Sequence, residues 1–220
     1  ATVRGLVNRL YWHNRCYPLG ETGVILQKTS TLFDVSAWEL FGWSLFGARV
    51  YLMPPGWDGS PAAVVETIAR GRVTHIHFIP ASLVPFLHHL ENTKAANRLH
   101  TLKYVFASGE ELTAEMVNRY NRQVYAVTGA TIHNLYGPTE ASIEVTYYDC
   151  PVDKPVTVVP IGKPIANTRL YILGPDAGLL PIGIPGELCI GGVGLARGYL
   201  NCPELTAEKF CLRQPGTFLK

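Results

Sequence analysis

The feature of this sequence that most constrains its fold is a regular alternation of short apolar runs with longer helical stretches, which continues to about residue 150. The short runs have the length and composition of buried strands. We expect strands at 24–27, 49–53, 75–79, 104–107 and 131–135, and helices at 37–46, 62–71, 81–90 and 114–124. Strands and helices that alternate in this way form a mostly parallel sheet with helices on both faces. The sequence therefore predicts an α/β fold for this part of the chain.

Beyond residue 150 the pattern changes, because glycine and proline recur too often to leave room for long helices. They stand at Gly162, Pro164, Gly174, Pro175, Gly178, Pro181, Gly183 and Pro185. This spacing favours short strands joined by turns, with one helix expected at 204–210. We therefore expect an α/β part at residues 1–150 and a β-rich part at 151–220, the latter forming a piece of a distorted barrel.

The composition excludes several classes of protein. With 47% hydrophobic and 16% charged residues, the chain has the composition of a globular protein with a buried core. The net charge of +2 is small and the basic residues are scattered, which argues against a nucleic-acid partner. The sequence has no uninterrupted apolar stretch of about 18 residues, so no membrane span is expected. The five cysteines form no C-x-x-C pair, which argues against a zinc cluster or a disulfide framework and favours reduced thiols in the cytoplasm.

Three segments carry residues suited to chemistry, and the first is Phe33-Asp34-Val35-Ser36-Ala37-Trp38-Glu39. It places an acid between apolar residues at the entry to a predicted helix. In one interpretation, Asp34 or Ser36 caps that helix by accepting its first free backbone N–H groups. In the other, Asp34 faces a pocket and pairs with the ammonium group of a substrate, because an unpaired buried charge is costly. The local sequence leaves both open.

The second segment, Asn134-Leu135-Tyr136-Gly137-Pro138-Thr139-Glu140, follows a predicted strand. Ligands of open parallel sheets bind beyond the carboxyl ends of the strands. A nucleotide site at this place would use Tyr136 to stack on the base and Asn134 to bond its edge. Thr139 would contact a phosphate, and Glu140 would hold magnesium, which prefers oxygen ligands.

The third segment is glycine-rich and runs from Gly186 to Tyr199. Its glycines invite comparison with a dinucleotide-binding fingerprint, but no predicted helix follows them as that motif requires. A sharp turn between β-strands is the better interpretation.

Taken together and in this order, the three segments resemble core motifs of the adenylate-forming superfamily, and more closely those of the adenylation domains of nonribosomal peptide synthetases. The matching motifs are Phe33-Asp34-x-Ser36, Asn134-x-Tyr136-Gly137-Pro138-Thr139-Glu140 and Gly186-Glu187-Leu188-x-Ile190-x-Gly192-x-Gly194-x-Ala196-Arg197-Gly198-Tyr199-Leu200. One such match would be weak evidence, whereas three at compatible separations are specific. The resemblance covers essentially the whole chain and implies flavodoxin-like α/β layers followed by a β-rich piece.

The resemblance implies an enzyme that joins an amino-acid carboxylate to ATP with release of pyrophosphate. The aminoacyl adenylate then passes to the phosphopantetheine thiol of a peptidyl carrier protein, next to condensation domains. ATP and Mg²⁺ are the implied cofactors. Thr139 and Glu140 are the implied catalytic residues, with Glu140 also the metal ligand, and Asp34 is the implied partner of the substrate α-ammonium. The residues implied to contact the nucleotide are Gly109, Glu110, Asn134, Tyr136, Gly137 and Thr139.

The side-chain pocket implied by the resemblance is lined by Asp34, Val35, Trp38, His77, Phe106, Ser108, Leu135, Ile143 and Glu144. It resembles the pocket of serine-activating domains, since Trp38 and Phe106 leave a small volume and His77 and Ser108 offer hydrogen bonds to a hydroxyl. Such pockets more often carry Asp where Glu144 stands. Threonine and 2,3-diaminopropionate are therefore the alternative substrates. Without the resemblance, His77 would be interpreted as a core histidine.

Two further functions stay open at this stage: a stand-alone acyl or aryl ligase of the same superfamily, and a scaffold that has lost catalysis. Asp34 and the proline in Tyr136-Gly137-Pro138-Thr139-Glu140 argue against the ligase, and the intact Thr139-Glu140 pair argues against the scaffold. The family's phosphate-binding loop, its ribose-binding aspartate and its C-terminal lysine subdomain have no match in this sequence. Loss of one such group costs about 100-fold to 1000-fold in rate, so we expect the isolated 220-residue chain to be nearly inactive.

Overall fold

The computed structural model describes residues 1–57, 59–213 and 216–219, and the chain divides into two compact units. The α/β unit consists of His13–Tyr136 and Tyr147–Gly162. The β unit consists of Ala1–Trp12, Gly137–Thr146 and Lys163–Lys220. Each unit is built from distant parts of the chain, unlike the consecutive segments 1–150 and 151–220 expected from the sequence.

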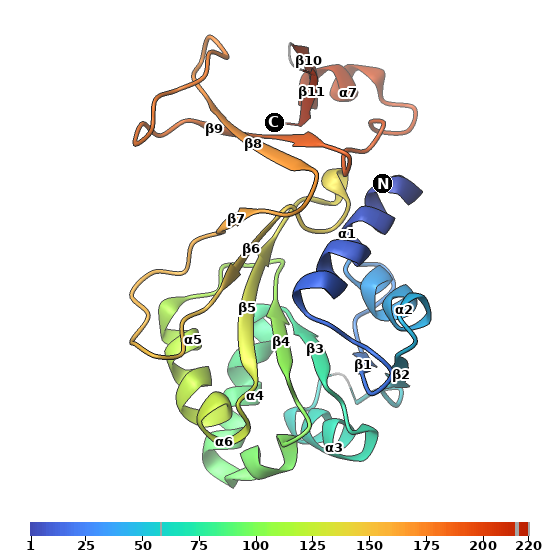
Figure 1. Cartoon of the computed structure of the whole chain (residues 1–220), viewed down its shortest axis with the longest axis vertical. Coiled ribbons are helices and arrows are strands. Elements are labelled where there is room, and N and C mark those ends of the chain that lie inside the picture. The colour runs from blue at the N-terminus through green and yellow to red at the C-terminus, as the bar shows by residue number, and fades with distance from the viewer. Residues whose placement is uncertain (58, 214–215, 220) are drawn as a thin grey trace. The chain divides into compact units, whose positions relative to one another are not determined.

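The α/β unit is organised around a mostly parallel sheet (Figure 1). Its parallel strands are β1 (Val24–Gln27), β2 (Arg49–Leu52), β3 (His75–Phe78), β4 (Tyr104–Ala107) and β5 (Thr131–Tyr136). They lie in the order β2-β1-β3-β4-β5, with β6 (Thr146–Asp149) next to β5. This is the flavodoxin-like order. The predicted α/β fold is confirmed, and each predicted strand ends within one residue of the observed one.

Helices α2 (Ser36–Leu45), α3 (Pro61–Gly71), α4 (Pro80–Thr93) and α5 (Ala114–Tyr120) pack in this unit. Two of them, α3 and α5, begin at a residue whose side chain caps the helix. The Ser60 side chain accepts a hydrogen bond from the N–H of Ala63 at the start of α3, and Thr113 does the same at α5. Three short helices complete the unit: η1 (Ala95–Leu99), η2 (Asn121–Tyr125) and α6 (Ala126–Thr128).

One long helix, α1 (Val3–Cys16), was not predicted from the sequence. Its buried residues recur with the helical period but include Gly5, Arg9 and His13 beside Trp12. Polar residues and a glycine on the buried face hide the apolar stripe by which an amphipathic helix is recognised. The miss therefore has a physical cause: this helix buries charge and rings where most helices bury aliphatic side chains.

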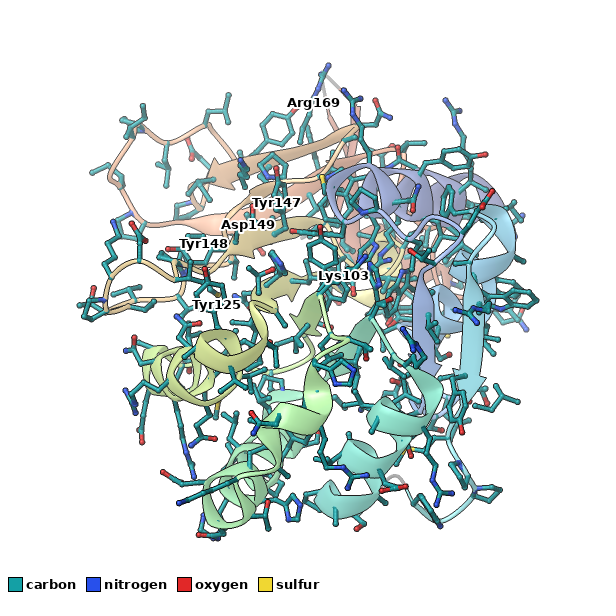
Figure 2. All side chains as sticks on the ribbon, turned by 60° about the horizontal axis from the view of Figure 1, so that its bottom comes forward. Lys103, Tyr125, Tyr147, Tyr148, Asp149 and Arg169 are labelled. Carbon is teal, nitrogen blue, oxygen red and sulfur yellow. The ribbon has the colours of Figure 1, made fainter. Side chains whose placement is uncertain are left out.

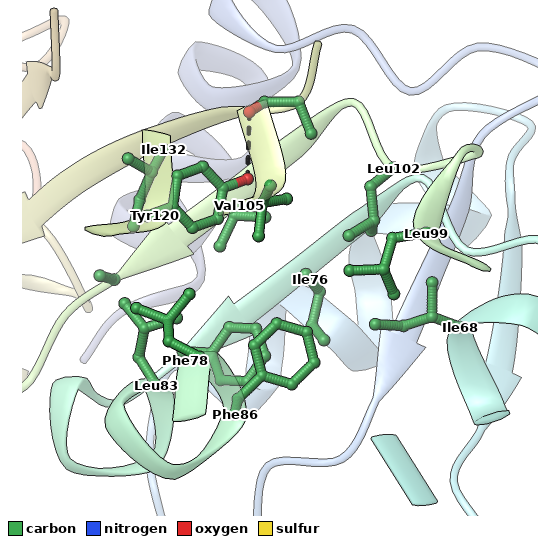
Figure 3. Packing of buried hydrophobic residues seen from close by; sticks show 14 of the residues in the cluster. Ile68, Ile76, Phe78, Leu83, Phe86, Leu99, Leu102, Val105, Tyr120 and Ile132 are labelled. Carbon is green, nitrogen blue, oxygen red and sulfur yellow. Dashed lines mark hydrogen bonds between the residues drawn. The ribbon is translucent and has the colours of Figure 1, made fainter. Parts of the chain in front are cut away.

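The two faces of the sheet differ in character because successive side chains of a strand point to opposite faces. One face carries Ile76, Phe78, Val105 and Ile132 and packs against α3, α4 and α5, forming the main hydrophobic core (Figure 3). The same core includes Tyr120, whose hydroxyl donates to the carbonyl of Ala130 at 3.1 Å.

The opposite face is lined with rings. Pairing in register places His77 beside Phe106, and Phe106 beside His133, on the neighbouring strands. His75 and Tyr104 stand two residues earlier in β3 and β4, so they lie on the same face, with ring centroids 5.0 Å apart. This face therefore carries both hydrogen-bonding groups and aromatic surface.

The β unit is organised around an antiparallel sheet. Its strands are β8 (Thr168–Leu173), β9 (Glu187–Gly192), β10 (Phe210–Arg213) and β11 (Gly216–Leu219), in the order β10-β11-β9-β8. The unit also contains η3 (Thr139–Ala141), β7 (Lys163–Pro164) and α7 (Pro203–Lys209). The glycine-rich segment forms β9 and the turns after it, as predicted. Within the described residues, no helix is long and apolar enough to cross a membrane.

The ring face generates a prediction about pH. Burial, followed by the charge of Lys103 (labelled in Figure 2), lowers the pKa of His75 from 6.5 to about 3. Below pH 6.5 the His75 imidazole is protonated in the unfolded chain but stays neutral in the folded chain. The free energy of unfolding therefore falls as the pH falls toward about 3. We expect His75→Gln to remove about 2 kcal/mol of the stability loss between pH 7 and pH 5.

Urea unfolding at both pH values measures this effect, and exposed His100 provides the matched control, His100→Gln. An equal loss of stability in the wild-type chain and in His75→Gln would show that folded His75 takes up the proton.

Candidate active site

The ring face of the sheet carries a buried pair of polar side chains. His77 in β3 and Ser108, which directly follows β4, lie with Nε2 and Oγ 2.8 Å apart. The two residues are almost inaccessible to solvent. The backbone N–H of Ser108 donates to the carbonyl of Phe78 at 3.2 Å, which continues the strand pairing to this point. A serine hydroxyl and an imidazole held in this way can each exchange a hydrogen bond with a small polar ligand.

Two large aromatic residues of the predicted pocket are in contact. The rings of Trp38 in α2 and Phe106 in β4 meet edge to face, with centroids 5.3 Å apart, and both are buried. His13 packs against both of them, at centroid distances of 4.9 Å and 4.5 Å. Sequence reasoning missed His13, and the only signal for it was its place on the buried stripe of an unpredicted helix.

Asp34 lies in the turn before α2, where the sequence left open a capping role. The residue at the N-cap position of α2 is Val35, and no side chain caps the helix there. Among the described residues, Asp34 Oδ2 is buried and has no hydrogen-bond partner. A carboxylate oxygen that is removed from water without a partner is costly. The geometry therefore favours a carboxylate held for a ligand over a helix cap.

The next acid along the chain, Glu39, shows how a satisfied buried carboxylate looks in this fold. Its oxygens accept hydrogen bonds from the N–H groups of Lys28 and Thr29 and from the Thr29 hydroxyl, at 2.6–3.1 Å. Burial raises the pKa of Glu39, while the hydrogen bonds from Thr29 lower it. This residue holds the loop that follows β1 and is not left open to a ligand.

The predicted nucleotide contacts of the α/β unit lie at the carboxyl ends of β4 and β5. Tyr136 is 38% exposed, so its ring is accessible for stacking. The Asn134 side-chain amide is buried and donates to the carbonyl of Pro160 at 3.0 Å. Glu110 accepts a hydrogen bond from the N–H of Ala81 at 2.9 Å and so caps α4. Gly109 has a φ of +90°, which favours glycine there.

Thr139 and Glu140 lie in the short helix η3 of the β unit. Glu140 Oε1 accepts a hydrogen bond of 2.5 Å from the hydroxyl of Tyr199, and its backbone carbonyl accepts one from Ala196 at 2.6 Å. The bond to Glu140 raises the pKa of Tyr199. Thr139 is exposed and Glu140 is half-buried. The second and third motifs are thus in contact within this unit.

The segment after η3 has an unusual backbone. Ser142 and the β-branched Ile143 have φ values of 65° and 79°, in the left-handed region that such residues rarely adopt. Gly137 approaches it so closely that a Cβ there would lie 2.5 Å from Cα of Glu144. Glycine at 137 is therefore required by this close approach of two backbone segments, a role that sequence reasoning did not assign to it.

The predicted site residues are divided between the two units. The α/β unit contains Asp34, Val35, Trp38, His77, Phe106, Ser108 and Leu135 of the side-chain pocket, with Gly109, Glu110, Asn134 and Tyr136 of the nucleotide set. The β unit contains Ile143, Glu144, Gly137, Thr139 and Glu140. The described residues contain no cluster of three or more His, Cys, Asp or Glu side chains that could hold a metal ion.

Comparison with known proteins identifies the family to which this chain belongs. Residues 1–200 match the family described as AMP-binding enzyme. A mycosubtilin synthase protein of Bacillus subtilis is 53% identical over 211 residues, which are 94% of this chain and 8% of that protein. Zwittermicin A synthase ZmaJ of Bacillus cereus is 48% identical over 207 residues, which are 93% of this chain and 39% of that protein.

A solved structure of the nonribosomal peptide synthetase FmoA3, bound to alpha-methyl-L-serine-AMP, superposes with a TM-score of 0.88 at 29% identity. The match covers 98% of this chain and 24% of that one. The chain belongs to the family of AMP-binding enzymes, and it spans a small part of the length of the proteins that it resembles.

The close approach at Gly137 generates a second prediction. A methyl group there overlaps backbone atoms, which cannot rotate away as a side chain can, so the segment 143–145 must move. We expect Gly137→Ala to reduce the free energy of unfolding by about 1–3 kcal/mol. Gly59→Ala is the matched control, because an added Cβ at that position meets nothing within 4 Å. Urea unfolding of both variants measures the difference, and equal stability would contradict the observed contact.

Proposed function

We propose that this chain is the central part of an amino-acid adenylation domain. In the proposed reaction, a carboxylate oxygen of the amino acid attacks the α-phosphorus of ATP. The bond from that phosphorus to its bridging oxygen breaks, and pyrophosphate leaves with the electron pair. The observation that carries the proposal is the buried, unpartnered Oδ2 of Asp34 in a chain of the AMP-binding family. An α-ammonium group is the ligand chemistry that such a carboxylate oxygen accepts.

We propose L-serine as the substrate. The paired His77 and Ser108 supply hydrogen-bonding groups for a hydroxyl, and the Trp38–Phe106 contact limits the volume beside them. The FmoA3 structure that shares this fold was solved with alpha-methyl-L-serine-AMP, whose side chain ends in the same hydroxyl. Threonine and 2,3-diaminopropionate are the alternatives, since each differs from serine by one small group.

The residues also fit ATP and Mg²⁺. Magnesium is commonly held by one or two carboxylates, with phosphate oxygens and water completing its six ligands, so a dedicated metal cluster is not required. Glu140 is the carboxylate proposed for this role, and a hydrogen bond from the Tyr199 hydroxyl to its Oε1 would orient it. Bound Mg²⁺ would neutralise phosphate charge during transfer. Thr139 is proposed to contact a phosphate, and Tyr136 and Asn134 to contact the adenine.

The proposed next step passes the aminoacyl group to the phosphopantetheine thiol of a peptidyl carrier protein, beside condensation domains in a longer synthetase. This is supported by the two bacterial relatives, which are named as synthases and are much longer than the aligned region. A cytoplasmic location is proposed with this role.

The experiment that tests the proposal is amino-acid-dependent exchange of pyrophosphate into ATP. The segment is joined into a folded, related adenylation domain, and a panel of amino acids is assayed. A serine-dependent signal supports both the reaction and the substrate, and a signal with another amino acid overturns the choice of serine alone. If a soluble chimera that binds ATP gave a signal with aryl or fatty acids only, the function would be that of an acyl or aryl ligase.

The role of Asp34 generates a third prediction. In the same chimera, we expect Asp34→Asn to reduce kcat/KM for serine by about 30-fold or more, because truncating one partner of a buried charge pair costs at least about 2 kcal/mol. The kcat/KM for glyceric acid, which has a hydroxyl in place of the ammonium, should be the same in Asp34→Asn as in the wild type. Exposed Asp153 provides the control variant Asp153→Asn. Undiminished use of serine by Asp34→Asn would refute the assignment.

A further inference from the structure

The antiparallel sheet of the β unit carries a pocket that the proposed function does not use. Its volume is about 420 Å³, which lies within the range of small-molecule sites, about 300–1,000 Å³. The residues that shape it are Arg169, Tyr171, Gly191, Leu195, Ala196 and Phe218. All of them belong to the β unit, and none is assigned to the candidate active site. The pocket can therefore be described within this unit alone.

A glycine at the centre of the pocket leaves a gap in the sheet surface. Strand pairing places Gly191 of β9 between Arg169 of β8 and Phe218 of β11, in one row across the sheet. Residues opposite one another in such a row put their side chains on the same face. Because Gly191 has no side chain, the row has a gap between a guanidinium and a phenyl ring. Glycine inside a strand often marks a place where a ligand approaches the backbone closely.

Two aromatic rings border this gap. A Cβ at Gly191 would lie 3.2 Å from Cδ1 of Phe218 and 3.4 Å from Cε2 of Tyr171. The two rings meet edge to face, with centroids 4.7 Å apart. Leu173 and buried Cys189 pack with them in a small hydrophobic cluster, which supports the rings from the side of β8 and β9. The pocket therefore offers aromatic surface that is held in place by its own core.

Arg169 supplies a positive charge at the same place. Its side chain, labelled in Figure 2, is exposed, and no carboxylate pairs with it in the part of the chain that the structure describes. Arg9 of the same unit, by contrast, is paired with Glu144. A guanidinium binds a carboxylate or a phosphate through two parallel hydrogen bonds. The pocket thus combines an anion-binding group with an aromatic wall.

We propose that this pocket binds a small aromatic anion. The ring of the ligand packs against Tyr171 and Phe218 beside Gly191, and its carboxylate or phosphate pairs with Arg169. Both features are needed in one molecule, because an exposed ion pair alone contributes little to binding. The proposal does not rest on the adenylation reaction, since it uses no residue of the candidate active site. Failure of either proposal leaves the other intact.

The experiment is a titration of the 220-residue chain, followed by the NMR signals of its backbone amides. The probes are 2-naphthoate, 2-naphthyl phosphate, uncharged 2-naphthamide, and acetate, which has no ring. We expect the signals of Arg169, Gly191 and Gly192 to shift with the two aromatic anions. Their dissociation constants should be at least about 10-fold lower than those of 2-naphthamide and acetate. The tighter of the two aromatic anions then identifies the preferred anionic group.

Variants separate the charge from the aromatic wall. Arg169→Gln should make 2-naphthoate bind no more tightly than 2-naphthamide, whereas exposed Arg4 in α1 provides the control Arg4→Gln, with no change expected. Gly191→Ala fills the gap with a methyl group and should weaken both naphthalene ligands to a similar extent.

Three results would overturn the proposal. The first is equal binding of 2-naphthoate and 2-naphthamide by the wild-type chain, since the charge would then have no role. The second is a set of shifted signals that lies outside the pocket or is unchanged by Arg169→Gln. The third is the absence of shifts at millimolar concentrations of both aromatic anions.

Discussion

The constraint on which the α/β unit depends is the alternation of side chains across its parallel strands. The central strands present apolar residues to α3, α4 and α5 on one face, so every second position is free to carry something else. In β3 and β4 those positions hold His77 and Phe106, which register places beside each other. The candidate pocket is thus the other half of the pattern that builds the core. A change of register by one residue would exchange the two faces and destroy both.

The β unit depends on close approaches between backbone segments, as the parallel sheet depends on the alternation of side chains. Gly137 can approach Glu144 because it lacks a Cβ, and Gly194 comes within 2.6 Å, Cβ position to oxygen, of the carbonyl of Ala141 for the same reason. The Tyr199 hydroxyl then reaches Glu140. The glycines of the second and third motifs are therefore needed where two backbone segments pack too closely for a Cβ, in addition to any contact with a nucleotide. These contacts also explain why the residues between them tolerate a left-handed backbone.

The sequence predicted the elements whose signal is local and missed those whose signal is distant. Strands β1 and β4 were found at their observed limits, because an apolar run between turn residues is visible in one short window. Helix α1 was missed because Arg9 and His13 occupy its buried face. The partners that explain them lie far away along the chain, at Glu144, Trp38 and Phe106. No local pattern connects residues separated in this way, so the contacts needed a structure.

Glu39, Glu144 and Asp34 have buried carboxylate oxygens but differ in the groups that satisfy their charge. This difference indicates which carboxylate is available to bind a ligand. Glu39 accepts hydrogen bonds from Lys28 and Thr29, and Glu144 is paired with Arg9. Among the described residues, Oδ2 of Asp34 and Oε1 of Glu144 are both buried without a hydrogen-bond partner, but Glu144 has Arg9 to match its charge through Oε2. A folded protein tolerates an unsatisfied buried carboxylate oxygen only where another benefit offsets its cost, and substrate binding is such a benefit. This argument supports the proposal that Asp34 meets the ammonium of an amino acid.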